Sequence, residues 1–105
     1  MPSVKGRRVT IYVNEADEWH GKPVHLAVLR YLAGEGCAGG TVLRGVAGFT
    51  KAAGVVTTSL VDAGGKLPLV IEYIDKPEVV ERVLPRLREI VGNRLITLED
   101  LELYP

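Results

Sequence analysis

Hydrophobic residues follow a two-residue period in some segments of this chain and a helical period in others, and the order of these segments limits the fold more than any other feature. Residues 8–14 alternate between apolar and polar side chains, as in a strand with one buried face. The next pattern is a broad apolar helical face, with Pro23 at the expected first helical position and Gly34 at its end. A second strand, rich in β-branched residues, is expected over Thr41–Val46.

The second half of the chain supplies further extended segments. A short extended piece is expected over Val55–Val61, and Asp62–Gly65 has the composition of a turn. Pro68–Asp75 is apolar on both faces, which predicts a strand at the centre of a sheet. Leu95–Leu98 and Leu101–Tyr104 are expected to form a last strand, with a β-bulge at the two acidic residues between them, Glu99 and Asp100.

A second helix is expected from apolar residues that recur at helical spacing up to Gly92. Asp75 and Glu78 have the spacing of a capping box, in which two side chains bond free backbone amides at a helix start. Pro85 lies inside the pattern and predicts a kink, because proline removes one helical hydrogen bond.

The order of these elements is β-α-β-β-α-β, which is the split βαβ arrangement. It predicts an α+β domain with a four-stranded antiparallel sheet and both helices on one face. The opposite face, which Thr10, Tyr12 and Arg44 are expected to line, has mixed polarity. Such a face suits self-association better than contact with open water.

Length and composition limit the class of protein. The 105 residues suit a single domain, residues 1–105. The 13 basic and 13 acidic residues balance, which argues against a general nucleic-acid binder. One cysteine forms no internal disulfide, and no apolar run resembles a signal peptide or a membrane span, so a cytoplasmic protein is expected.

The segment from Arg44 to Lys51 has the features of an anion-binding loop. It follows a strand pattern, and Gly45 and Gly48 leave the backbone amides open to a ligand because they have no Cβ atom. A cation stands at each end, and Lys66 closes the long connection. A phosphate group is the natural ligand for such a segment, while the alternative is that the two glycines only end a strand.

Other polar residues give little sign of chemistry. His20 and His25 are five positions apart with no third ligand in view, which makes a poor metal site. Cys37 ends the first helix and is expected to be a small buried residue. No acid, base and nucleophile set is visible, so no catalytic residue is predicted and a non-enzymatic protein is expected.

The sequence resembles the PII-like proteins called domain of unknown function 190. The similarity runs in register from Val9 to Leu103. It rests on four segments, which are Trp19–Pro23, Ala38–Phe49, Leu67–Glu72 and Leu95–Asp100.

This resemblance implies a PII-like, ferredoxin-like fold and a homotrimer with a cleft between each pair of subunits. Gly48 and Phe49 look like the turn that, in PII proteins, leads into a long mobile loop and helps to hold ATP or ADP. Residues 48–66 would be that loop. Thr50 stands where a glycine is common, and the segment after it lacks the usual cations, which leaves Lys51 as the main one.

The leading hypothesis is therefore a non-enzymatic trimeric signalling or regulatory protein. A small anionic ligand such as ATP, ADP or AMP would bind at the intersubunit cleft and change how the loop docks on a partner. Some relatives are encoded beside fluoride-channel proteins, which suggests a membrane transporter or channel as that partner. The alternative is a structural or metal-responsive trimer of the same fold, in which His20 and His25 would matter more than Gly48.

Overall fold

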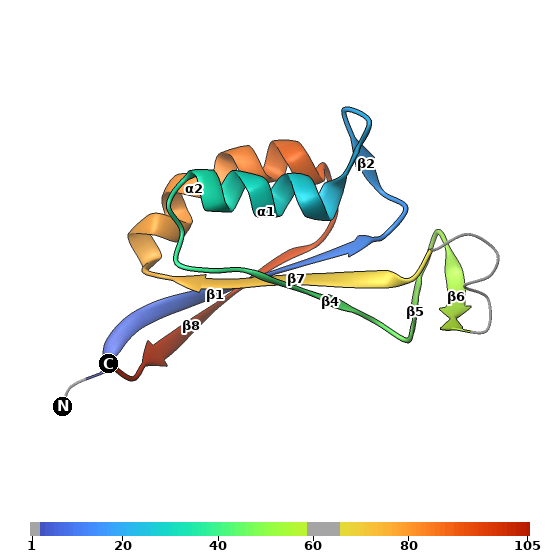
Figure 1. The fold of residues 1–105 in the computed structure, drawn as a ribbon. Coiled ribbons are helices and arrows are strands. Elements are labelled where there is room, and N and C mark those ends of the chain that lie inside the picture. Colours follow the sequence, from blue (N-terminus) through green and yellow to red (C-terminus); the bar gives the residue numbers. More distant parts are fainter. Residues whose placement is uncertain (1–2, 59–65) are drawn as a thin grey trace.

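The computed structural model describes residues 3–58 and 66–105, which form a four-stranded antiparallel sheet and two helices (Figure 1). Across the sheet, the strands are β4 (Thr41–Arg44), β7 (Pro68–Asp75), β1 (Val4–Asn14) and β8 (Ile96–Leu103). The predicted central position of β7 is confirmed, because β7 pairs with β4 on one side and with β1 on the other.

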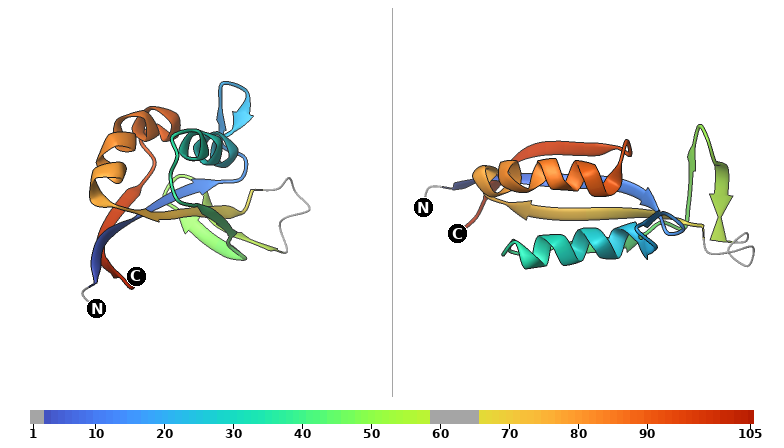
Figure 2. Two further views of the ribbon diagram at one scale, coloured as in Figure 1. Left: turned by 60° about the vertical axis from the view of Figure 1, so that its left-hand side comes forward. Right: turned by 90° about the horizontal axis from the view of Figure 1, so that it is seen from above.

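Both helices cover the same face of the sheet, as Figures 1 and 2 show for α1 (Val24–Gly34) and α2 (Pro77–Val91). The α+β fold with a four-stranded antiparallel sheet and two helices is therefore confirmed. Pro23 is the residue before α1 and not its first helical residue. Pro85 lies inside α2, which continues as one helix through it.

The hydrophobic core lies between this sheet and the two helices. Val9, Ile11 and Val13 of β1 are buried there, as their alternation predicted, and they lie directly opposite apolar residues of β7. Gly6 is required in the same strand, since a Cβ atom at this position would lie 2.6 Å from Cγ of Leu103.

Two small hairpins complete the described part of the chain. β2 (Glu18–Trp19) pairs with β3 (Lys22–Pro23), and β5 (Ala47–Thr50) pairs with β6 (Gly54–Thr57). The β5–β6 hairpin projects beyond one end of the main sheet (Figures 1 and 2).

The predicted extended piece Val55–Val61 is strand up to Thr57. Its last three residues, and the predicted turn Asp62–Gly65, lie outside the described residues.

The predicted capping box at α2 is wrong. Asp75 is still the last residue of β7, and Lys76 is the N-cap, with no side chain bonding the free amides. The carboxylate of Asp75 instead accepts hydrogen bonds from the backbone amides of Ala38 at 3.0 Å and Lys76 at 2.8 Å. Asp75 stands one residue before the N-cap, and its side chain contacts the segment that enters β4 at Ala38.

The predicted bulge in the last strand is also wrong. β8 pairs with β1 without interruption, from Val4 opposite Leu103 to Ile11 opposite Ile96. Glu99 and Asp100 fit into the regular strand because they form ion pairs with Arg8 and Arg7 on the adjacent strand.

The face of the sheet away from the helices is covered by no described element (Figure 2). Thr10 and Tyr12 lie on this face, as expected. Arg44 does not. It shares the side of β4 that carries Val42, which packs against the core. In the described part of the chain, neither helix has the length and apolar character that crossing a bilayer demands.

Candidate functional site

The base of the β5–β6 hairpin contains the first of the predicted site residues. Arg44 does not have a free guanidinium, since its Nε lies 3.0 Å from Oε2 of Glu15 and its second terminal nitrogen donates to Oε1 at 3.1 Å. This is a two-point ion pair, the strongest arrangement that these groups form. It lowers the pKa of Glu15 below its usual value, first through the hydrogen bond from Arg44 and then through that from the Leu67 amide.

Gly45 and Gly48 both lie against Pro68. A Cβ atom at either glycine would come within 2.9 Å of the Pro68 ring, and the amide of Gly45 donates to the Pro68 carbonyl at 2.8 Å. This close approach explains both glycines without a ligand. Gly48 and Phe49 lie inside strand β5, so the prediction that they form a turn is wrong.

The remaining predicted residues lie at separate places. Lys51 is exposed in the turn at the tip of the hairpin, while Lys66 is exposed at its base, where its carbonyl accepts from Asn14 Nδ2 at 2.7 Å. Phe49 is 78% exposed. Arg44 and Lys66 are therefore brought to the same end of the hairpin, and Lys51 is not.

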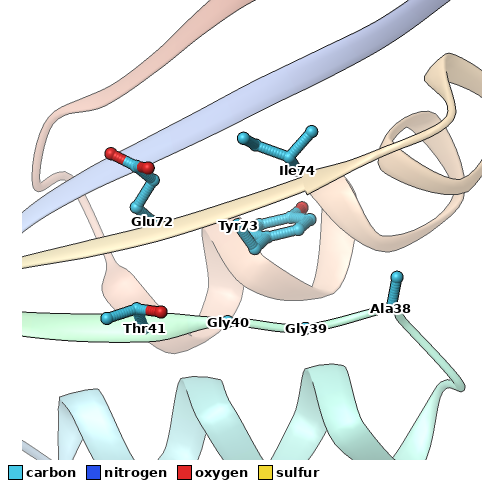
Figure 3. A pocket seen from close by; sticks show the side chains of 7 residues that line it. All are labelled: Ala38, Gly39, Gly40, Thr41, Glu72, Tyr73 and Ile74. Carbon is cyan, nitrogen blue, oxygen red and sulfur yellow. The ribbon is translucent and has the colours of Figure 1, made fainter. Parts of the chain in front are cut away.

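A cavity of about 300 Å³ lies beside β4 and β7, where the two strands stop pairing (Figure 3). Its walls are the segment that enters β4 and the adjacent stretch of β7. The lining residues are Ala38, Gly39, Gly40, Thr41, Glu72, Tyr73 and Ile74.

The cavity offers both side-chain and backbone polar groups. Thr41 and Glu72 are directly opposite each other in the strand register, so their side chains share one face of the sheet. Gly39 and Gly40 leave the backbone open, and a Cβ atom at Gly40 would come within 3.3 Å of the Leu29 side chain. A hydroxyl, a carboxylate and bare backbone can recognise a ligand that both donates and accepts hydrogen bonds.

Tyr73 contributes a hydroxyl that has no partner. The residue is 2% exposed, and its hydroxyl is fully buried with no hydrogen bond among the described residues. Burial raises the pKa of Tyr73 well above its usual value, so this hydroxyl stays protonated at any physiological pH. A buried hydroxyl without a partner is uncommon. Because neighbouring strand residues point to opposite faces of a sheet, this hydroxyl lies on the core side of β7, while Glu72 lies on the free face.

Sequence reasoning did not identify these cavity residues. Two signals were available. Gly39 and Gly40 stand directly before a strand, and Glu72 is the one charged residue inside the apolar run from Leu69 to Ile74. Neither signal shows that the two segments lie side by side, because that depends on the pairing of β4 with β7.

The other candidate residues take structural positions. Trp19 and His20 pack edge to face with ring centres 4.2 Å apart, and Arg86 lies over the Trp19 ring. Burial raises the pKa of Cys37, which makes its thiol less reactive. Within residues 3–58 and 66–105, no group of three or more His, Cys, Asp and Glu side chains could hold a metal.

A second cavity, of about 560 Å³, lies where β1, β8 and the start of α2 meet. Lys5 and Arg7 line it together with Asp100 and Glu102, so its charges balance. Arg7 already pairs with Asp100. This cavity shows no preference for an anion or a cation.

Comparisons with known proteins agree on one family. The family model DUF190, described as an uncharacterised ACR family, matches residues 6–103. A UPF0166 protein of Methanocaldococcus jannaschii is 32% identical over 102 residues, covering 96% of this chain and 94% of that protein. A UPF0166 protein of Aquifex aeolicus is 36% identical over 104 residues, covering 97% and 96%.

A solved structure shares the fold. The PII-like nitrogen regulatory protein CPII from Thiomonas intermedia K12, bound to ADP, AMP and bicarbonate, has a TM-score of 0.70 to this chain. The match covers 95% of this chain and 89% of that one at 14% identity. At this identity the likeness establishes a PII-like fold.

Proposed function

The chain belongs to the DUF190 family, and from this membership and the cavity beside Glu72 we propose that it is a non-enzymatic PII-like regulator that binds an adenine nucleotide. The regulator is cytoplasmic and forms a homotrimer. The observation that carries the proposal is the cavity, with its Thr41 hydroxyl and its Glu72 carboxylate on one face of the sheet. The PII-like neighbour supports the choice of nucleotide, because it was solved with ADP and AMP bound.

The chemistry of the cavity suits an adenine base. Adenine donates through its amino group and accepts through its ring nitrogens. Glu72 accepts only, and the Thr41 hydroxyl can donate or accept. The cavity volume of about 300 Å³ is at the lower end for small-molecule sites, which favours one ring system with part of the ligand outside.

The phosphates would extend from the cavity along β4. This strand has four residues, a length of about 13 Å at roughly 3.3 Å per residue. A nucleotide that follows it would bring its phosphates toward Gly45 and, on the hairpin, Lys51. In this arrangement the bound phosphates would contact the hairpin and stabilise one position of the hairpin relative to others.

The uncovered sheet face supports assembly. Tyr12 and Leu43 lie on this face and are 46% and 57% exposed. Large exposed apolar residues on a sheet face favour contact with another chain. In a trimer the neighbouring subunit would close the cleft beside the cavity and supply further phosphate contacts.

The projecting hairpin is the natural contact for a downstream partner. Phe49 and Val55 are paired across it, so both side chains lie on one face, and they are 78% and 68% exposed. We propose that the hairpin docks on a membrane transporter or channel and that the bound nucleotide decides whether it does.

Calorimetric titration of the purified protein with ATP, ADP, AMP and adenosine tests the nucleotide. Saturable binding of at least one phosphorylated ligand is expected, with adenosine weaker because it lacks the phosphate contacts. Replacing Glu72 with alanine should weaken binding by about tenfold or more, as expected for loss of a hydrogen bond to a charged acceptor.

Glu102→Ala is the matched control, because it removes a carboxylate from the second cavity and should leave affinity unchanged. If none of the three nucleotides binds at millimolar concentration, the proposed ligand is wrong. If Glu72→Ala and Glu102→Ala lowered nucleotide affinity equally, the nucleotide would not bind in the cavity beside Glu72.

A further inference from the structure

The carboxylate of Glu15 contacts both ends of the segment that carries the β5–β6 hairpin. One end is Arg44, whose guanidinium it binds at two points, 3.0 and 3.1 Å. The other end is Leu67, whose backbone amide donates to Oε1 of the same carboxylate at 2.9 Å. The Glu15 side chain, which lies outside this segment in the sequence, thus contacts both Arg44 and Leu67.

The local backbone keeps Glu15 in place for this role. Its own amide donates to the Leu67 carbonyl at 3.0 Å, and Asn14 Nδ2 donates to the Lys66 carbonyl at 2.7 Å. The Glu15 side chain is 17% exposed, against 53% for that of Arg44. The carboxylate is therefore the fixed partner, and the guanidinium is the partner that solvent and ligands can reach.

Among the described residues, the hairpin exposes much of its surface. Gly45 and Gly48 rest on Pro68, but the opposite face of the hairpin carries exposed Phe49 and Val55. An element with few buried contacts is the part of a fold that opens most readily. The contacts at Glu15 consequently have a large share in deciding where the hairpin lies.

We infer that Glu15 is a latch that fixes the β5–β6 hairpin through Arg44 and Leu67, and that an anion binds Arg44 only by displacing it. The inference rests on the proposed function only in taking the ligand to be anionic. Glu15 acts as an internal counter-ion that occupies Arg44 when no ligand is bound. Binding of an anion would release one end of the hairpin, so that occupancy and hairpin position are linked.

Acid is not the physiological trigger of this latch. The described charged groups that act on Glu15 are Arg44 of β4 and His25 of α1. The pKa of Glu15 in the folded protein lies below its usual value, so the stabilisation is fully present above that usual value and is lost as pH falls through the lower folded value. Near neutral pH only a competing anion opens the latch.

Amide hydrogen exchange measured by NMR on the ligand-free protein tests the latch directly. The reporter is the Gly45 amide, because its acceptor is Pro68 and not Glu15. Glu15→Gln, which removes the charge at nearly constant shape, should speed Gly45 exchange by about tenfold. Exchange in the paired amides of β1 and β7 should stay unchanged.

Three further variants make the result specific. Glu18→Gln removes an exposed carboxylate three residues away and should change nothing. Arg44→Gln breaks the same pair from the other side and should match Glu15→Gln. The charge exchange Glu15→Arg with Arg44→Glu should restore slow exchange at Gly45.

Titration with inorganic phosphate, followed by the same amide signals, tests the competition. Glu15→Gln should bind phosphate several-fold more tightly than the unchanged protein, because Arg44 is no longer neutralised. Unchanged phosphate affinity, unchanged Gly45 exchange, or faster exchange spread evenly over the whole sheet would each overturn the latch. Absence of nucleotide binding would overturn only the proposed function, since none of these measurements uses a nucleotide.

Discussion

At the scale of single residues, Tyr73 links the core to the cavity. Its ring is part of the hydrophobic core, and its hydroxyl is buried without a hydrogen bond in the described structure. Leaving a buried polar group unpaired costs about 1–3 kcal/mol. The unpaired hydroxyl is therefore expected to lower the stability of the free protein, while ligand contact is expected from Thr41 and Glu72 on the other face of the sheet.

Tyr73→Phe separates these two effects. The free protein should gain up to about 1 kcal/mol in free energy of unfolding, because the unpaired hydroxyl is gone and the ring remains. Nucleotide affinity should stay nearly unchanged, because the Tyr73 hydroxyl lies on the core side of the sheet and Glu72 and Thr41 lie on the other side. Urea denaturation and calorimetry measure the two quantities on the same sample.

Tyr104→Phe serves as the control, since Tyr104 is 94% exposed and its hydroxyl meets water in either state. A loss of stability of more than about 1 kcal/mol in Tyr73→Phe would show that the hydroxyl has a partner in the free protein.

The predicted site residues show what a local sequence pattern can and cannot predict. Gly45, Gly48 and the flanking cations were predicted to form an anion-binding loop, and the anion stays a prediction. Their local reason is different, because Pro68 requires the two glycines and Glu15 neutralises Arg44. Both partners are distant in sequence, so no local pattern reveals them.

At the scale of elements, Asp75 connects the entry of β4 with the start of α2. Its two carboxylate oxygens accept from the Ala38 and Lys76 amides. The segment that forms one wall of the cavity is thereby fixed to the rigid end of β7. A capping box would have tied Asp75 to the helix alone.

Replacing Asp75 with alanine should therefore lower the free energy of unfolding by about 1–2 kcal/mol, because two backbone amides lose their acceptor. It should also weaken nucleotide binding, because Ala38 and Gly39 are no longer held. Glu78→Ala is the comparison. It removes only an acidic residue from the first turn of α2 and should cost about 0.3–1 kcal/mol. Equal losses in the two variants would favour the capping box instead.

Strands and helices with strong periodicity were predictable, and the short strands β2, β3 and β5 were not. The alternation over residues 8–14 and the helical spacing before Gly92 are dictated by burial on one face. The β5–β6 hairpin has little burial of its own, so its residues carry no clear period. The expected mobility of residues 48–66 stays a prediction.

At the scale of the whole molecule, the sheet has one face under the helices and one face free. Tyr12 and Leu43 lie on the free face, beside the half-buried Val70. Exposed apolar residues on a sheet face are typical of a surface that another subunit covers. The proposed trimer would bury it.

If the proposed trimer forms through this face, the double variant Tyr12→Glu with Leu43→Glu should be monomeric, because two charges would have to be buried without partners. Size-exclusion chromatography with light scattering gives the mass directly. Tyr104→Glu adds a charge at a position that is 94% exposed and should leave the trimer intact. A trimeric double variant would place the subunit contact elsewhere.

By itself, the sequence determined the order of elements, the buried faces of the main strands and the family. These follow from periodicity and from motifs in register, which are properties of neighbouring residues. Only the tertiary structure decided which residues meet. Pairing of β4 with β7 creates the cavity of Thr41 and Glu72, and the return of the chain at Leu67 brings Arg44 to Glu15. Contacts between segments distant in the chain depend on the whole fold, because each requires the strands and helices between them to be in place.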